Sequence, residues 1–359
     1  MGSASAYSLA KKKLSVLGLE QFTLGHDRGS SNGQRRIIRR AYFEKNDYIP
    51  LLNAAYPLWD EMGKRAARKL FHRVGLVVFG EKGNSRLADR IRLAGLAFNI
   101  PFEIISAGAA KERYPFSIPE NFEGVLEPEA GYTDVEASLE ALRSFAVQEG
   151  AELRGEEPLV GWQATDGEVV VQTEKGEYRA KHLVLTTGGW SGNWLRLDKP
   201  LLRPRRGPQM WFKSPPSYDN IPCYAFDLAK DFYYGFPPQA GWGTKLAAYT
   251  PVDDVKDPSH VDPVIPEASK QELAGIIQRF LPGVATTHQR EKMCFYTLTP
   301  DEDFLLDHHP RHRNVVVATG GSGHAFKFTP IIGEIVSDLV KDGKTAHPIE
   351  FLSFRRFAG

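Results

Sequence analysis

The sequence has few cysteines, no long apolar run and no excess of charge of either sign. Its two cysteines, Cys223 and Cys294, do not make a disulfide framework, so a reducing compartment is expected. No apolar stretch approaches the roughly 20 residues that span a bilayer. The 45 basic and 44 acidic residues leave a net charge of +1, which provides no overall attraction to nucleic acid or to an anionic membrane.

These limits favour a cytoplasmic protein that has neither a membrane nor a nucleic acid as partner. Three lysines at 11–13 precede an apolar segment that is too short, and too acidic at Glu20, for a signal peptide. A chain of 359 residues with a hydrophobic share of 42% is long enough for two domains, each with its own core. The sequence shows no internal repeat, low-complexity tract or coiled-coil heptad.

The stretch 292–327 carries the most informative pattern. An apolar run at 315–318 is followed by a glycine cluster, and helical spacing then extends over 330–340. The glycines of the cluster are Gly320, Gly321 and Gly323. The order of strand, glycine turn and helix brings backbone N–H groups to a phosphate or a cofactor ring in α/β proteins. Taken alone, however, a glycine turn is often only a turn, and a lone cysteine such as Cys294 is usually a small buried hydrophobe.

The N-terminal segment has the order of another nucleotide-binding unit. Residues 3–13 predict a helix, and residues 14–19 predict a strand that ends at Glu20. A helix followed by a strand that is closed by an acid is the back half of a dinucleotide-binding βαβ unit, in which the acid binds the ribose hydroxyls. A second strand and glycine turn are predicted at 182–191, with Gly188 and Gly189 in the turn.

A glycine-bearing loop leads into a basic run over residues 28–42. Arg36 and Arg39 are three residues apart and would share one face of a helix, where a guanidinium could hold a carboxylate by two parallel hydrogen bonds. The alternative is a solvated basic helix face. The apolar positions of 48–71 recur at helical spacing and are assigned to the core.

From residue 200 to 280 the α/β alternation stops, which predicts a mostly β domain. Residues 232–237 and 243–249 are expected to be neighbouring strands. Lys245 lies inside an apolar alternation, which is costly unless the lysine is paired or functional; the structural alternative is a stem that reaches water. Three histidines in a turn lack helical spacing and a cysteine partner, so no metal is expected there. They are His308, His309 and His312.

The two halves of 292–327 together form one ordered pattern. It is C-x-Y-T-x-T-P-D-E-x-F-x-x-D-x-H-P followed by G-x-S-G-H-x-F-K, and it resembles the monomeric sarcosine oxidase family over nearly the whole chain. The resemblance implies an enzyme that oxidises a secondary amino acid, N-methyl or cyclic, to an imine, with oxygen as acceptor and hydrogen peroxide as product. It also implies FAD bound covalently through Cys294, a mixed α/β fold with a Rossmann-like FAD-binding domain and a second, mostly β substrate domain, and a monomer.

The resemblance further implies a set of site residues. The catalytic residues are Lys245, which would lie over the flavin and help oxygen react, with Arg36 and Tyr249. The substrate residues are Arg39 and Lys327 at the carboxylate, and Tyr234 and Tyr296 in the pocket. The cofactor residues are Gly2, Glu20, Arg36, Gly188, Gly189, Cys294, Gly320, Gly321, Gly323, His324 and Lys327. Tyr249 stands where sarcosine and N-methyltryptophan oxidases carry histidine, which leaves the identity of the amine substrate open. Asn32 also stands where close relatives carry histidine, so the tuning of the flavin by that ring is not expected here.

The same resemblance predicts discontinuous domains and a short N-terminus. The FAD-binding domain is expected at 1–72, 133–199 and 301–359, and the substrate domain at 73–132 and 200–300. In the family a strand and a G-x-G-x-x-G turn precede the first helix; here Gly2 takes the place of the third glycine, and the strand and the first two glycines are absent. We therefore expect two strands to lack a neighbour, and we interpret the start as one assigned inside a longer gene.

Two other functions remain open from the sequence. One is a glycine-oxidase or D-amino-acid-dehydrogenase type of enzyme with non-covalent FAD. The other is a non-catalytic binding protein or relic that lost its cofactor with its first glycines. The missing glycines favour the relic, whereas the joint retention of Arg36, Arg39, Lys245, Cys294 and Lys327 argues against it, because a chain without function has no physical reason to keep buried-type cations at one site.

Overall fold

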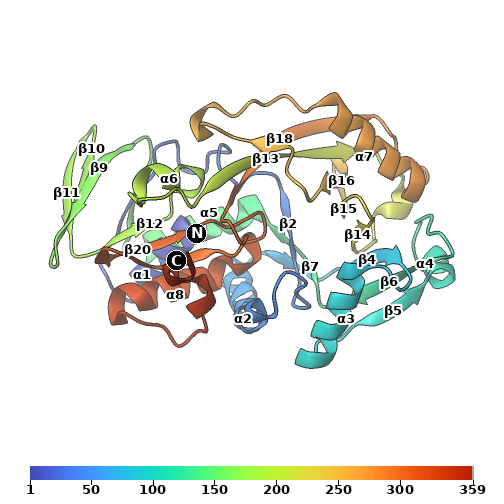
Figure 1. Cartoon of the computed structure of the whole chain (residues 1–359), viewed down its shortest axis with the longest axis horizontal. Coiled ribbons are helices and arrows are strands. Elements are labelled where there is room, and N and C mark those ends of the chain that lie inside the picture. The colour runs from blue at the N-terminus through green and yellow to red at the C-terminus, as the bar shows by residue number, and fades with distance from the viewer. Residues whose placement is uncertain (358–359) are drawn as a thin grey trace.

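The structure is a computed structural model that describes residues 1–357; Ala358 and Gly359, which belong to the last segment of the predicted FAD-binding domain, lie outside the described residues. A β meander lies at one end of the molecule, and β4–β6 with α3 and α4 lie at the other (Figure 1). The helices are α1 (Gly2–Lys11), α2 (Ile49–Arg65), α3 (Arg86–Phe98), α4 (Ala107–Arg113), α5 (Val135–Gln148), α6 (Ser191–Trp194), α7 (Glu267–Phe280) and α8 (Thr329–Asp342).

A sheet with both faces covered forms the centre of one half. Its order is β12 (Leu183–Leu185), β20 (His312–Thr319) and β19 (Leu305–His309). Successive residues of β20 point to opposite faces. Val315 and Val317 pack with the meander of β9 (Leu159–Ala164), β10 (Val169–Thr173) and β11 (Gly176–Ala180). Val316 and Ala318 pack with the helical cluster of α1, α2, α5 and α8. The continuous apolar run of β20 is therefore explained by burial on both sides.

Several strands of this half have a neighbour on one side only. Among residues 1–357, β1 (Leu17–Leu19) pairs in parallel with β8 (Glu152–Arg154) and with no other strand, and β12 pairs with β20 alone. Because every open sheet ends in strands with one partner, the expectation that two strands of the region lack a neighbour stays a prediction. The predicted helix at 3–13 and the strand before Glu20 are confirmed as α1 and β1.

The other half is built on a nine-stranded sheet. Its order is β17 (Asp253–Asp254), β13 (Arg203–Phe212), β16 (Gly243–Ala248), β15 (Phe232–Gln239), β14 (Cys223–Asp227), β4 (Leu76–Glu81), β6 (Phe122–Glu127) and β5 (Glu103–Ser106), and β18 (His288–Leu298) pairs with β13. The predicted neighbours at 232–237 and 243–249 are antiparallel partners, as expected. The long strands β13 and β18 run beside each other over the top of the view, with α7 beyond them (Figure 1).

A three-stranded sheet of β2 (Arg35–Ile38), β7 (Gly131–Asp134) and β3 (Phe71–His72) joins the halves. The helix predicted through Arg36 and Arg39 is therefore wrong. The β-branched pair Ile37 and Ile38 favours a strand, and a ladder to β7 takes the backbone hydrogen bonds from Arg35 to Ile38. A Cβ on Gly131 would lie 1.9 Å from the carbonyl oxygen of His72, so only glycine fits between the outer strands.

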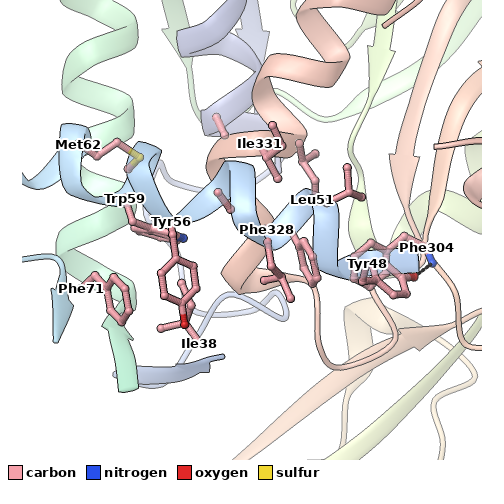
Figure 2. Packing of buried hydrophobic residues seen from close by; sticks show 14 of the residues in the cluster. Ile38, Tyr48, Leu51, Tyr56, Trp59, Met62, Phe71, Phe304, Phe328 and Ile331 are labelled. Atoms are coloured by element: carbon pink, nitrogen blue, oxygen red, sulfur yellow. Dashed lines mark hydrogen bonds between the residues drawn. The ribbon is translucent and has the colours of Figure 1, made fainter. Parts of the chain in front are cut away.

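The apolar stripe of α2 lies in the core, as predicted. Trp59 is fully buried and its Nε1 donates to the carbonyl of Lys327 at 2.8 Å, and the Tyr48 hydroxyl accepts from the backbone N–H of Phe304 at 3.0 Å. Figure 2 shows how the stripe packs against α8 and two strands; it labels Ile38, Tyr48, Leu51, Tyr56, Trp59, Met62, Phe71, Phe304, Phe328 and Ile331. Helix α2 thus fixes the segment that precedes α8 through both apolar and polar contacts.

Within residues 1–357, none of the helices combines the length and the apolar character that a membrane span requires.

Helices α1 and α8 approach closely at Gly333, where a Cβ would lie 2.6 Å from the carbonyl oxygen of Ala4 and 2.7 Å from Ser8 Oγ. We predict that Gly333→Ala destabilises the protein by about 1–3 kcal/mol, because overpacking moves α1 away from α8. The matched control is Gly275→Ala in α7, where no atom lies within 4 Å of the added Cβ.

The control should be neutral or should stabilise by about 0.5–1 kcal/mol, because alanine favours a helix over glycine. Urea denaturation of both variants measures the difference. Equal stability of the two variants would refute the close contact between α1 and α8.

Candidate active site

The N-terminus of α1 faces the end of β12. The helix begins after Met1, which offers no side-chain cap to its first turn, and a Cβ on Gly2 would lie 2.9 Å from Thr186 Oγ1. The first N–H groups of a helix have no acceptor within the helix and attract an anion. Glu20 follows β1, and its carboxylate accepts from the Phe22 N–H at 3.0 Å and lies 3.4 Å from His26 Nε2. A helix start without a side-chain cap and an acid thus stand in the order that the sequence predicts.

The two predicted glycine turns need glycine for different reasons. Gly188 has φ +53° and open space around its Cβ position, whereas a Cβ on Gly189 would lie 2.3 Å from the ring of Phe295. In the second turn Gly320 and Gly323 have φ +61° and +81°, which favours glycine. Gly321 has an ordinary backbone, and its Cβ would meet Met1 at 3.4 Å. The turns therefore approach the start of α1 and the strand that carries Cys294.

Cys294 lies beside two cations. It is 1% exposed in β18, directly opposite Gly207 of β13, and its Sγ lies 3.9 Å from Arg36 Nη2. Lys245 is 3% exposed, so its stem does not reach water as the structural alternative required. Its Nζ lies 3.5 Å from the carbonyl oxygen of Arg35. Burial, followed by the charge of Arg36, lowers the pKa of Lys245 well below its usual range.

Two tyrosines complete this group. Burial raises the pKa of Tyr234 and of Tyr296, and each hydroxyl is close enough to the other to influence its titration. A Cβ on Gly207 would lie 2.8 Å from the ring of Tyr296, so this glycine makes room for the ring. Because burial raises their pKa, Tyr234 and Tyr296 keep their protons at neutral pH. The ring of Phe232 lies between Tyr234 and Tyr249, with its centroid 5.9 Å from that of Tyr234 and 5.7 Å from that of Tyr249.

Arg39 and Lys327 form a second pair of cations around one aromatic ring. The Arg39 guanidinium lies 4.3 Å from the ring centroid of Tyr42, and Lys327 Nζ lies 5.2 Å from it. Arg39 donates to both carboxylate oxygens of Glu44 at 2.7 Å, whereas Lys327 donates to the carbonyl of His324 at 2.7 Å. Burial and Arg39 lower the pKa of Lys327 to about 7, against an opposing effect of Glu44.

His324 connects Tyr42 to the turn at Glu302. Its Nε2 lies 3.1 Å from the Glu302 carbonyl, which can only accept, so Nε2 carries the proton and Nδ1 accepts from the Tyr42 hydroxyl at 2.5 Å. Burial lowers the pKa of His324 to about 4, so the ring is neutral at neutral pH. His324 thus orients the ring on which Arg39 and Lys327 rest.

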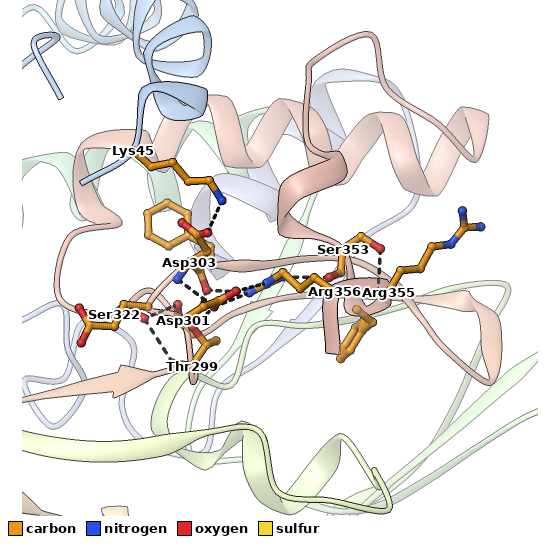
Figure 3. Close-up of polar contacts among 12 residues, drawn as sticks. Lys45, Thr299, Asp301, Asp303, Ser322, Ser353, Arg355 and Arg356 are labelled. Carbon is orange, nitrogen blue, oxygen red and sulfur yellow. Dashed lines mark hydrogen bonds and ion pairs between the residues drawn. The ribbon is translucent and has the colours of Figure 1, made fainter. Parts of the chain in front are cut away.

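The acidic residues of the T-P-D-E-D motif hold a turn. Figure 3 shows Thr299, Asp301 and Asp303 joined to one another, to Lys45 and to Arg356. The Lys45 Nζ lies 2.7 Å from the Asp303 carboxylate, and Arg356 Nε lies 2.8 Å from that of Asp301. This network fixes the turn that accepts from His324, and so it supports the site from outside.

The histidines of the 308–312 turn bond to backbone groups. His309 Nε2 lies 2.7 Å from the carbonyl oxygen of Leu195, and His308 Nδ1 lies 2.7 Å from that of Arg313. In the part of the chain that the structure describes, no three His, Cys, Asp or Glu side chains are grouped as a metal site.

The residues present fit a flavin. Four buried oxygens near Arg36 and Cys294 have no hydrogen-bond partner within residues 1–357. They are Asn32 Oδ1, Gln34 Oε1, Gln209 Oε1 and Thr297 Oγ1. Buried acceptors of this kind require donors, which the hydroxyl and ring N–H groups of FAD supply. The N–H groups at the start of α1 could donate to phosphates, the Glu20 carboxylate could accept from ribose hydroxyls, and the cations near Cys294 could face the ring.

Sequence reasoning missed three residues of this site: Tyr42, Glu44 and Gly207. Glu44 lies five residues after Arg39, but only the turn that follows β2 brings the two side chains together. Gly207 lies in an apolar strand, and its close contact with Tyr296 depends on the pairing of β13 with β18. The run R-R-A-Y-F-E was the one available signal for Tyr42 and Glu44, since it places an aromatic and an acid next to the arginines.

Comparison with known proteins gives one family over most of the chain. The family described as FAD dependent oxidoreductase matches residues 1–339. The monomeric sarcosine oxidase of Bacillus sp. (strain B-0618) is 34% identical over 99% of this chain and 93% of its own. The N-methyl-L-tryptophan oxidase of Yersinia pestis (strain Pestoides F) is 29% identical over 99% of this chain and 96% of its own.

The fold is similar to that of solved structures as well. The open form of NikD, described as an unusual amino acid oxidase essential for nikkomycin biosynthesis, superimposes with a TM-score of 0.88 and is 26% identical. The similarity covers 98% of this chain and 94% of NikD. The mixed α/β fold expected from the sequence is therefore confirmed.

The arrangement of Arg39 and Lys327 predicts a pH-dependent site for small carboxylates. Lys327 carries a proton below pH 7 and loses it above, because its pKa is about 7. Affinity for benzoate should therefore be constant below pH 7 and should fall as the pH rises from 7 to 9. Titration calorimetry at several pH values measures this profile.

Lys327→Met should bind benzoate weakly and without this pH dependence. The control is Lys45→Met, because Lys45 pairs with Asp303 outside the cluster, so the wild-type profile should be retained. A decline in affinity above pH 7 that persists in Lys327→Met would contradict the assignment.

Proposed function

Because the chain belongs to the FAD dependent oxidoreductase family, we propose that it oxidises a secondary amino acid, N-methyl or cyclic, with oxygen as the acceptor. It is a FAD-dependent amino-acid oxidoreductase. The products are an imine, which water hydrolyses, and hydrogen peroxide. Oxidation of secondary amino acids is supported by relatives that are named sarcosine oxidase and N-methyl-L-tryptophan oxidase.

One observation carries this proposal: buried cations meet beside a cysteine and around an aromatic ring. Arg39, Lys245 and Lys327 are each at most 5% exposed, and the repulsion between Arg39 and Lys327 is relieved by one carboxylate, Glu44. Buried charges in such numbers are costly and mark a site for an anion. An amino acid provides a carboxylate, and a flavin provides an electron-accepting ring.

The residues of the chain position the substrate. Arg39 and Lys327 hold its carboxylate by charge-assisted hydrogen bonds, while the rings of Tyr234 and Tyr249 limit the space for its side chain. The bound flavin supplies the two-electron acceptor and passes electrons on to oxygen. Catalysis by the protein is then mostly positioning of the carbon that loses hydride. Neutral His324 keeps Tyr42 in place and is not a base.

Lys245 serves the reaction with oxygen in this proposal. Its Nζ is buried beside Arg36 and Cys294, where a positive charge would stabilise negative charge that develops during the reaction with oxygen. A preorganised cation stabilises such charge more effectively in a dry site than in water. Arg36 lies 3.9 Å from Cys294 Sγ and is close enough to Lys245 to influence its pKa, so it adds a second positive charge to this part of the site.

Several finer features belong to the same proposal. FAD is attached through Cys294, which is supported by the approach of Arg36 to its Sγ. The cofactor domain comprises 1–72, 133–199 and 301–359, and the substrate domain 73–132 and 200–300; the separate sheets support this division. The enzyme acts as a monomer in the cytoplasm, consistent with two buried, free cysteines within residues 1–357.

Two alternatives can be compared with the site. A relic has no physical reason to retain three buried cations, and the full-length similarity to NikD shows that the fold is maintained. An enzyme with non-covalent FAD would share all the geometry except the bond to Cys294. The discriminating observation is therefore the state of the flavin.

Acid precipitation of the purified protein tests the covalent bond. The wild-type precipitate should stay yellow, whereas Cys294→Ser should release free flavin into the supernatant. Cys223→Ser is the matched control, because Cys223 is equally buried, burial raises its pKa, and it starts β14 away from the site. Yellow colour in the wild-type supernatant would establish the non-covalent alternative.

Replacement of Lys245 separates the two halves of the reaction. In Lys245→Met, reoxidation by oxygen should slow by about 100-fold or more, because a preorganised charge is lost. Anaerobic reduction by the amino acid should change by less than about fivefold, and stopped-flow absorbance measures both steps. Lys292→Met is the control, since Lys292 lies two residues from Cys294 but pairs with Asp27 at the surface. Slowing of the reductive step alone would contradict the assignment.

A further inference from the structure

Glu127 lies where the chain leaves the strand that carries Arg36. The ladder between β2 and β7 runs from Arg35 to Ile38, where Ile38 faces Gly131. Beyond that point the next N–H groups have no strand to pair with. The backbone N–H of Arg40 donates to Glu127 Oε1 at 2.7 Å, and that of Ala41 donates to Oε2 at 3.0 Å. One carboxylate thus replaces two rungs of the ladder.

The same residue marks the passage between two sheets. Glu127 is the last residue of β6 and faces Leu76 of β4 in the nine-stranded sheet. Its carbonyl oxygen accepts from the Ala130 N–H at 3.3 Å in the turn that leads to β7. The position of its carboxylate is therefore fixed by both sheets, because the backbone is held on each side.

Glu127 is costly to bury and is compensated locally. It is 2% exposed, and burial raises its pKa while the two backbone N–H groups and then Arg39 and Arg40 oppose this shift. A carboxylate that accepts from backbone N–H groups forms bonds roughly twice as strong as those between neutral groups. Residues 40 and 41 are thus held more firmly than a turn alone would hold them.

This clamp affects Arg39, which lies between Ile38, the last residue of the ladder, and Arg40, whose N–H donates to Glu127. With the backbone fixed on both sides, its guanidinium is directed to the face of Tyr42 and to Glu44. We propose that Glu127 is a positioning residue for substrate carboxylate binding, acting through the backbone of Arg40 and Ala41. It touches neither substrate nor cofactor. The inference rests on the proposed function of Arg39.

The test compares Glu127→Gln with Glu129→Gln. Glutamine keeps the shape but turns an NH2 group toward one of the two N–H donors, so one bond is lost. Glu129 is the matched control: it is two residues away, is 47% exposed, and pairs with the side chain of Arg40 instead of the backbone. Hydrogen exchange of the Arg40 and Ala41 amides reports the clamp directly, and steady-state kinetics report its effect.

In Glu127→Gln both amides should exchange faster, and KM for the amino acid should rise about ten- to hundredfold, because a small misplacement of a binding group is costly. The kcat and the flavin content should stay within about threefold of wild type. Glu129→Gln should leave exchange and KM unchanged. If Glu127→Gln does not fold, Glu127→Asp takes its place, with the charge kept and the reach shortened.

Two results would overturn the proposal. One is faster exchange with unchanged KM; the other is a parallel loss of kcat, flavin and stability, which indicates a purely structural role. If the wild type oxidises no secondary amino acid, the proposed function fails independently. Amide exchange and benzoate affinity then still decide whether Glu127 positions Arg39.

Discussion

The burial of cations in two groups, Lys245 beside Cys294 and Arg39 with Lys327 around Tyr42, is the constraint on which the site depends. All three are almost fully buried, and of these three only Arg39 has an ion pair within residues 1–357, with Glu44. The two lysines donate to backbone carbonyls instead. Burial lowers the pKa of both lysines, and for Lys327 it does so to about 7, so that part of the charge of Lys327 can be lost at neutral pH without a ligand. An anion that binds beside these cations would therefore be stabilised by them.

The cations and Cys294 come from strands and turns in distant parts of the chain. Arg36 lies in β2, Lys245 in β16 and Cys294 in β18, while Lys327 follows the glycine turn after β20. Glycine allows this crowding at particular points, since Gly131 lets β3 approach β7 and Gly207 admits the ring of Tyr296. The turn that supports His324 is held by ion pairs, since Asp301 pairs with Arg356 and Asp303 pairs with Lys45 (Figure 3). The positions of these side chains thus depend on how the sheets pack where they meet.

The sequence predicted elements well where periodicity was strong and failed where charge concealed a strand. Helices α1, α2 and α8 and the pair β15 and β16 were all expected. The arginine run was expected to be helical, yet it forms β2, because its partner β7 lies about 95 residues further along and no local pattern reveals it. The shared helix face that was expected for Arg36 and Arg39 is therefore wrong, while their roles at the site stay a prediction. Glu44 and Glu127 could not be predicted, since their partners are set by tertiary contacts.

In the proposed function, the unequal pairing of Arg39 and Lys327 lets the site prefer an amino acid to a simple amine. Arg39 already has Glu44, so an amine without a carboxylate leaves that pair intact and gains nothing from it. Lys327 has only a carbonyl partner and a pKa of about 7, so a carboxylate that approaches it restores its charge and forms a new ion pair. The binding energy thus comes mainly from a cation that the fold left without an acid. Discrimination arises because a buried polar group is satisfied by the correct ligand and left unsatisfied by the wrong one.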